Sequence, residues 1–163
     1  LEKNINDPGE ILSELHKGIV LSLKQESDVK AWGEAIDASV CYFDFSSNKL
    51  KFAGAINHIY LLSEGEIEVI KGDFKSVGGI FKRKVKPDRS FATKEKVLKQ
   101  GDRVYLFTDG YCDQFGGDNN EKFNTHRFKD LIIDSSDKSM SQQNERIFSE
   151  IQNWMLEPMS LLI

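Results

Sequence analysis

Cysteine and histidine are scarce in this sequence, and neither residue type is clustered. The two cysteines, Cys41 and Cys112, form no Cys-x-x-Cys pair, and the three histidines, His16, His58 and His126, are equally scattered. This spacing excludes a zinc ribbon, a disulfide-rich secreted scaffold and a metal site built from neighbouring histidines. We therefore expect reduced, buried cysteines in a cytoplasmic protein.

The sequence also lacks a long hydrophobic run and an excess of positive charge. No apolar stretch approaches the roughly 18 residues needed to span a membrane, and residues 1–6 are too polar for a signal peptide. Lys and Arg number 22 against 26 Asp and Glu, a net charge of −4. Nucleic acid is therefore a poor default partner. Since Leu1 is not a natural start, we expect the natural N-terminus to lie upstream.

Proline and glycine are few, at three and 12 of 163 residues, which argues against a disordered or collagen-like chain. The length suggests a single domain over residues 1–163, or part of a larger one. A helix is predicted at 8–25, with Asp7 as its cap and Pro8 in its first position. Apolar residues at helical spacing predict its buried face: Ile11, Leu12, Leu15, Ile19 and Leu23.

Strands are predicted through the middle of the chain, and helices at its end. Two hairpins are expected, at 38–45 with 49–54 and at 58–63 with 66–71, followed by a strand or extended piece at 89–97 and a strand at 103–108. Residues 25–37, 72–88 and 109–122 read as loops. Two helices are expected at 125–134, with Phe128, Leu131 and Ile132 inward, and at 139–156, with Ile147, Phe148, Ile151, Trp154 and Met155 on the apolar face. This order predicts an α+β fold with a mostly antiparallel sheet and packed helices.

One stretch carries chemistry: YLFTDGYCDQFGG, residues 105–117. An apolar strand ends in Asp109, so its carboxylate lies at the mouth of a sheet, and Gly110 adds no side-chain bulk beside it. A carboxylate held this way suits a hard divalent ion such as Mg²⁺ or Mn²⁺. The alternative is a simple turn in which Asp109 caps backbone amides.

The same stretch resembles the second half of a SpoIIE-type phosphatase domain, a branch of the metal-dependent protein phosphatases of the 2C type. Residues 104–117 are similar to that branch nearly throughout. Residues 52–61 resemble its FAGANNPxYL segment, 70–73 its IKGD, and 77–79 its PIG-like turn. The resemblance covers residues 7–155.

The resemblance implies an α-β-β-α sandwich with two antiparallel sheets between helical layers. It also implies two Mn²⁺ or Mg²⁺ ions bridged by aspartates, with a metal-bound water that attacks a phosphoserine or phosphothreonine. Asp109 matches a metal ligand of the family, with Gly110 beside it. Asp113 is similar to an acid that orders the loop or supports the site; its alternative role is a solvated carboxylate.

The chain departs from the family in ways that point to an incomplete site. The family supplies further metal-binding acids upstream of the position of Leu1. It also has an Asp-Asp pair after the helix that contains Trp154, where this sequence has no Asp. His58 stands in place of a proline, and we expect a strand-edge residue rather than a ligand. Cys112, beside Asp109, is expected to be a packed loop cysteine rather than a redox-sensitive thiol.

The sequence therefore predicts part of a protein serine/threonine phosphatase domain of bacterial signalling, inactive as this chain alone. By resemblance, its partner is a phosphoprotein substrate such as an anti-sigma-factor antagonist. Two alternatives stay open: a catalytically dead module for interaction or dimerisation, and an unrelated α+β domain that binds a small molecule. Because strands from both ends of the family domain are missing, we also expect self-association, most simply as a homodimer.

Overall fold

The computed structural model describes residues 6–23, 35–79 and 88–156. The chain divides into two compact units. Unit 1 comprises Leu1–Leu61 and Val69–Leu106, and unit 2 comprises Leu62–Glu68 and Phe107–Ile163. The helices and strands of the chain are α1 (Pro8–Ser22), β1 (Ala35–Ile36), β2 (Ala38–Asp44), β3 (Lys49–Ala55), β4 (Ile59–Ser63), β5 (Glu66–Ile70), β6 (Val77–Gly78), β7 (Lys94–Val97), β8 (Arg103–Leu106), α2 (Asp109–Cys112), β9 (Phe115–Gly116), β10 (Glu121–Lys122), α3 (Asn124–Asp134) and α4 (Met140–Leu156).

Helix α1 begins as the sequence predicts, but its buried face differs from the predicted one. The Asp7 carboxylate accepts a 2.9 Å hydrogen bond from the Glu10 amide, which confirms the cap. Leu15 and Leu23, predicted to be buried, are exposed. The fully buried face includes His16 instead, because its Nδ1 accepts a hydrogen bond from the Gly78 amide at 2.9 Å. A partner distant in sequence thus makes burial of a polar side chain possible.

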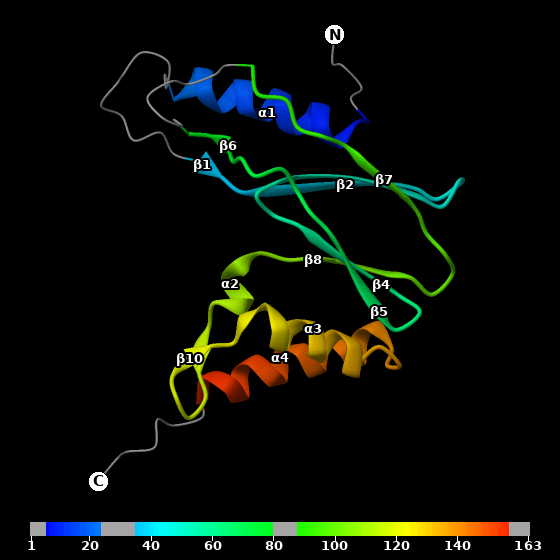
Figure 1. Cartoon of the computed structure of the whole chain (residues 1–163), viewed down its shortest axis with the longest axis vertical. Coiled ribbons are helices and arrows are strands. Elements are labelled where there is room, and N and C mark those ends of the chain that lie inside the picture. The colour runs from blue at the N-terminus through cyan, green and yellow to red at the C-terminus, as the bar shows by residue number, and fades with distance from the viewer. Residues whose placement is uncertain (1–5, 24–34, 80–87, 157–163) are drawn as a thin grey trace. The chain divides into compact units, whose positions relative to one another are not determined.

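The central strand of unit 1 is β3, which contributes to two hydrophobic clusters. It pairs antiparallel with β2 and β7, in the order β2-β3-β7. Alternate residues point to opposite faces. Ala53 and Ala55 pack with Leu12 of α1 in one cluster, so α1 covers this face of the sheet (Figure 1). Leu50 and Phe52 pack in the other cluster, whose remaining buried members are Ile59, Leu61 and Ile70 of β4 and β5.

A second sheet has the order β5-β4-β8. The predicted hairpin is confirmed: Glu64 and Gly65 connect β4 to β5, and both have positive φ, 52° and 85°. This is the conformation of the tight turn that matches strand twist. The α+β prediction with antiparallel sheets is therefore confirmed. Within the predicted strand or extended piece at 89–97, strand β7 covers Lys94–Val97.

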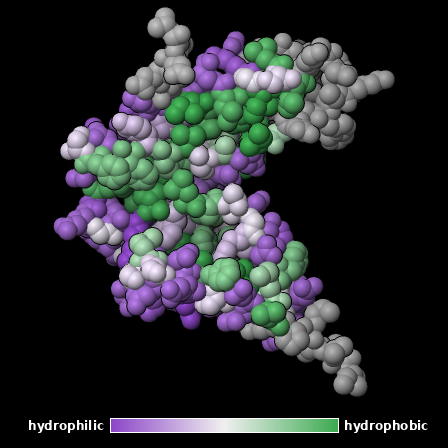
Figure 2. All heavy atoms as spheres, turned by 180° about the vertical axis from the view of Figure 1, so that it is seen from behind, coloured by the Kyte–Doolittle hydropathy of each residue, from purple (hydrophilic) through white to green (hydrophobic). Residues whose placement is uncertain are grey.

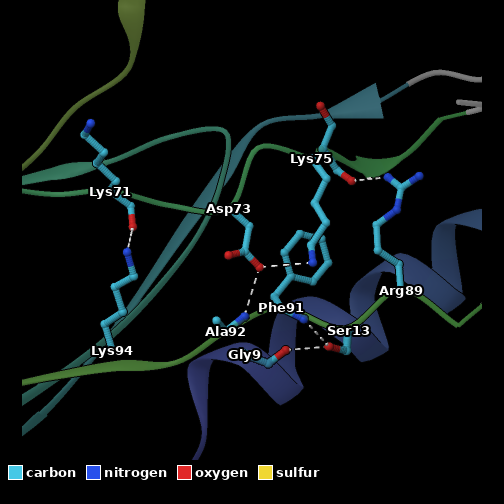
Figure 3. A network of polar contacts seen from close by, with 10 residues as sticks. Gly9, Ser13, Lys71, Asp73, Lys75, Arg89, Phe91, Ala92 and Lys94 are labelled. Atoms are coloured by element: carbon cyan, nitrogen blue, oxygen red, sulfur yellow. Dashed lines mark hydrogen bonds and ion pairs between the residues drawn. The ribbon is translucent and has the colours of Figure 1, made fainter.

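The extended segment before β7 is fixed by polar contacts rather than by a strand ladder (Figure 3). Asp73 accepts a 3.0 Å hydrogen bond from the Ala92 amide and pairs with Lys75 Nζ at 3.1 Å. The Lys75 ammonium also lies 5.1 Å from the centre of the Phe91 ring. Ser13 of α1 accepts from the Phe91 amide at 3.2 Å. These bonds hold residues 89–93 outside any strand, which agrees with the extended-piece alternative for residues 89–97.

Unit 2 contains α3 and α4, which lie side by side (Figure 1). Phe128, Leu131 and Ile132 are buried as predicted. The predicted face of α4 is only partly right, because Phe148 is 60% exposed, whereas Gln143 is buried. Gln143 Nε2 donates to the Ile132 carbonyl at 3.2 Å and to Ser135 Oγ at 3.0 Å, which satisfies a buried amide.

The segment 109–122, predicted as a loop, contains the short helix α2 and the small hairpin β9–β10. Residues 25–34 and 80–87 of the other two predicted loops lie outside the described residues. Across the described ranges, no helix combines the length and the apolar character that a membrane crossing requires.

Candidate functional site

Asp109 follows β8 after two residues and opens α2. Its side chain is exposed. The residue at the cap position of α2 is Thr108, with an extended backbone (φ −105°, ψ 169°), and Asp109 is the first residue of the helix. An exposed carboxylate is able to accept a hard cation. The role of Asp109 as a metal ligand stays a prediction.

Gly110 lies within the helical turn and has no positive φ, so the backbone there does not require glycine. A Cβ at this position would contact only Thr108 Oγ1, at 3.4 Å. The space next to Asp109 on this side is therefore open.

Asp113 lies at the end of α2, four residues after Asp109. Its amide donates to the Asp109 carbonyl at 2.8 Å, and its carboxylate pairs with Lys122 Nζ of β10 at 2.9 Å. Both side chains are about half exposed. The pair links the end of α2 to the small hairpin, and an exposed ion pair of this kind contributes little free energy.

Sequence reasoning missed the residues that attach this segment to α4. Tyr111 Oη donates to the Ile147 carbonyl at 2.7 Å. Trp154 Nε1 donates to the Gln114 carbonyl at 3.3 Å, and the Gly117 amide donates to the Trp154 carbonyl at 2.9 Å. The available signal was the pair Gly116-Gly117, because a Cβ on Gly116 would lie 1.9 Å from the Trp154 carbonyl oxygen.

Both cysteines are free thiols, as predicted. Cys112 is buried, whereas Cys41, also expected to be buried, is only partly so. Burial raises the pKa of the Cys112 thiol to about 11 and that of Cys41 to about 11. At neutral pH both are protonated and poorly nucleophilic, which supports a packed cysteine at position 112. His58 directly precedes β4, and its ring lies 5.7 Å from that of Tyr60.

Within the described ranges, no group of three or more His, Cys, Asp or Glu side chains is arranged to hold a metal ion. The described residues therefore do not supply a complete ligand set around Asp109. A single exposed carboxylate is a poor site for Mg²⁺ or Mn²⁺, which need several oxygen ligands.

Comparison with known proteins decides the family. The family model described as stage II sporulation protein E (SpoIIE) matches residues 1–160. The chain belongs to the SpoIIE family. A comparison with curated proteins gave no significant match.

Solved structures support the same fold. The SiaA-PP2C domain of Pseudomonas aeruginosa superposes with a TM-score of 0.77 at 27% identity, over 93% of this chain and 56% of that one. The phosphatase domain of SpoIIE from Bacillus subtilis, described as Mn presoaked, has a TM-score of 0.55 at 12% identity, over 97% of this chain and 68% of that one. The chain thus spans only part of both SpoIIE-family neighbours, and it has their PP2C/SpoIIE fold.

Proposed function

We propose that this chain is part of a metal-dependent protein serine/threonine phosphatase domain, in which Asp109 is one ligand of a Mn²⁺ or Mg²⁺ centre. The observation that carries the proposal is the position of Asp109 in a SpoIIE-family chain: an exposed carboxylate, shortly after β8, at the start of the short helix α2. The SpoIIE neighbour's description names manganese, which supports the choice of ion.

The residues of this chain would contribute binding and orientation. Asp109 offers oxygen ligands, Gly110 leaves room beside them, and Asp113 and Lys122 join α2 to the hairpin. A bound divalent ion would supply a more acidic water and neutralise phosphate oxygens. The remaining ligands have to come from residues other than the described ones.

The proposed substrate is a phosphoserine or phosphothreonine on a bacterial signalling protein in the cytoplasm, such as an anti-sigma-factor antagonist. PP2C-type domains act on phosphoproteins, and this general property supports the class of substrate. A second candidate is a catalytically dead module for interaction, which the lack of a metal-binding cluster among the described residues favours.

A phosphatase assay on the full-length natural protein tests the proposal. With p-nitrophenyl phosphate or a phosphopeptide, we expect Mn²⁺-dependent turnover that Asp109→Asn reduces at least tenfold. Asp118→Asn is the matched control, since Asp118 is an exposed aspartate of the same unit that lies between β9 and β10. Equal Mn²⁺ dependence in the wild type and in Asp109→Asn would reject Asp109 as a ligand. No Mn²⁺-dependent turnover in the wild type would favour the interaction module.

A further inference from the structure

The segment that follows Asp109 is attached to α4 at two places. Tyr111, two residues after Asp109, bonds to the carbonyl of Ile147. Farther along, Gln114 and Gly117 bond to Trp154. Ile147 and Trp154 are seven residues apart on α4, about two turns or roughly 10 Å. Two separated attachments fix the orientation of this segment relative to α4 as well as its position.

Tyr111 makes the first attachment. Its hydroxyl donates to the Ile147 carbonyl at 2.7 Å. Its ring lies 5.3 Å from the Phe123 ring, edge to face, and 4.9 Å from the Phe128 ring. The aromatic contacts hold the ring, so that the hydroxyl meets the α4 backbone in one orientation.

Trp154 makes the second attachment, and the Gln114 side chain connects it by a further hydrogen bond to the start of α2. Trp154 Nε1 donates to the Gln114 carbonyl, while Gln114 Nε2 donates to the Gly110 carbonyl at 2.7 Å. Gly117 packs flat on the indole, where a Cβ would lie 2.6 Å from the ring. The peptide next to Asp109 is thereby linked through one side chain to the end of α4.

We propose that α4 sets the orientation of the Asp109 carboxylate, and that Tyr111 and Trp154 are positioning residues for this ligand. The proposal deepens the proposed function and rests on it, because it assigns Asp109 as the group being positioned. A shift of α4 along its axis would move both attachments together and would carry Asp109 with them.

Hydrogen exchange on this chain tests the attachment without any activity. Tyr111→Phe removes only the hydroxyl, and Trp154→Phe removes the indole N–H. We expect at least threefold faster exchange for the amides of Asp113 and Gly117 in each variant, with the amides of β3 unchanged. Tyr42→Phe is the control, because Tyr42 lies on β2 of unit 1. Unchanged exchange over residues 109–117 would overturn the proposal.

A double-mutant cycle in the full-length protein separates positioning from general destabilisation. We expect Tyr111→Phe to raise the Mn²⁺ concentration for half-maximal activity at least threefold with the substrate KM unchanged, and to have no further effect on it in an Asp109→Asn background. Equal effects in both backgrounds would contradict action through Asp109. If Asp109→Asn itself leaves the Mn²⁺ dependence unchanged, the proposed function fails, and the exchange experiment still decides whether α4 holds the turn.

Discussion

The Ile56 amide donates a 2.8 Å hydrogen bond to the Asp73 carbonyl, and Ile56 has a φ of 64°. The turn is crowded on its inner side, because a Cβ on Gly54 would lie 2.1 Å from the Asn57 carbonyl oxygen and one on Gly72 would lie 2.2 Å from it. A β-branched residue in the left-handed region is strained, at a cost of about 1–2 kcal/mol. The surrounding turn thus holds Ile56 in a conformation that asparagine adopts far more easily.

Ile56→Asn should therefore stabilise the protein by about 1 kcal/mol, since it relieves backbone strain at a partly exposed site. The family motif that this segment resembles has asparagine at the position. Urea unfolding at neutral pH measures the change. Ile36→Asn serves as the control, because Ile36 is also partly exposed but is not among the residues with positive φ. A loss of stability in Ile56→Asn similar to that in Ile36→Asn would contradict backbone strain at Ile56.

The 163-residue chain alone should not hydrolyse p-nitrophenyl phosphate above background with Mn²⁺ or Mg²⁺. Asp109 is one carboxylate, and the described residues include no cluster that would complete a metal site. A colorimetric assay with a metal titration checks this. Mn²⁺-stimulated turnover that disappears in Asp109→Asn would show that the chain builds a complete centre by itself.

Acid should weaken the β2–β3 turn through Asp44. Hydrogen bonds from the Ser46 and Ser47 side chains lower the pKa of Asp44 to about 2. The pKa of an aspartate carboxyl in an unfolded chain is about 3.9. Because the folded pKa is the lower one, the contribution of Asp44 is fully present above about pH 4 and is lost as the pH falls through about 2. The difference in unfolding free energy between wild type and Asp44→Asn should shrink over this range; a constant difference would contradict the role of the carboxylate.

Self-association is expected from apolar side chains that unit 1 leaves exposed. Phe74 is 97% exposed and Phe45 is 87% exposed, with the Phe45 ring stacked on Phe43 at 6.2 Å. The space-filling view shows hydrophobic residues gathered on the visible face of unit 1 (Figure 2). Exposed apolar area of this kind favours association. Sedimentation should show a concentration-dependent dimer that Phe45→Ser with Phe74→Ser weakens. A monodisperse monomer at high micromolar concentration would refute self-association.

Local patterns predicted the hairpins and the helix ends because those features depend on neighbouring residues. Alternation and the Glu64-Gly65 turn were sufficient for β4 and β5, and Asp7 was sufficient for the start of α1. The buried face of α1 was predicted incorrectly since His16 is buried through a bond to Gly78, which periodicity within one helix does not encode.

In the candidate site, too, local sequence indicated one residue, Asp109, and missed two others, Tyr111 and Trp154. A strand followed by Asp-Gly indicated Asp109, because the chemistry is carried by adjacent residues. Tyr111 and Trp154 were missed because their roles depend on contacts between segments about 36 to 40 residues apart. Trp154 was instead expected to serve only as an apolar face residue of a helix.

Anomalous diffraction at the manganese edge, from Mn²⁺-soaked crystals of the full-length protein, decides whether Asp109 is a metal ligand. We expect a peak within coordination distance, about 2 Å, of an Asp109 carboxylate oxygen, and its loss in Asp109→Asn. Anomalous peaks only at other carboxylates, with Asp109 bonded to protein groups alone, would contradict the assignment of Asp109 as a metal ligand.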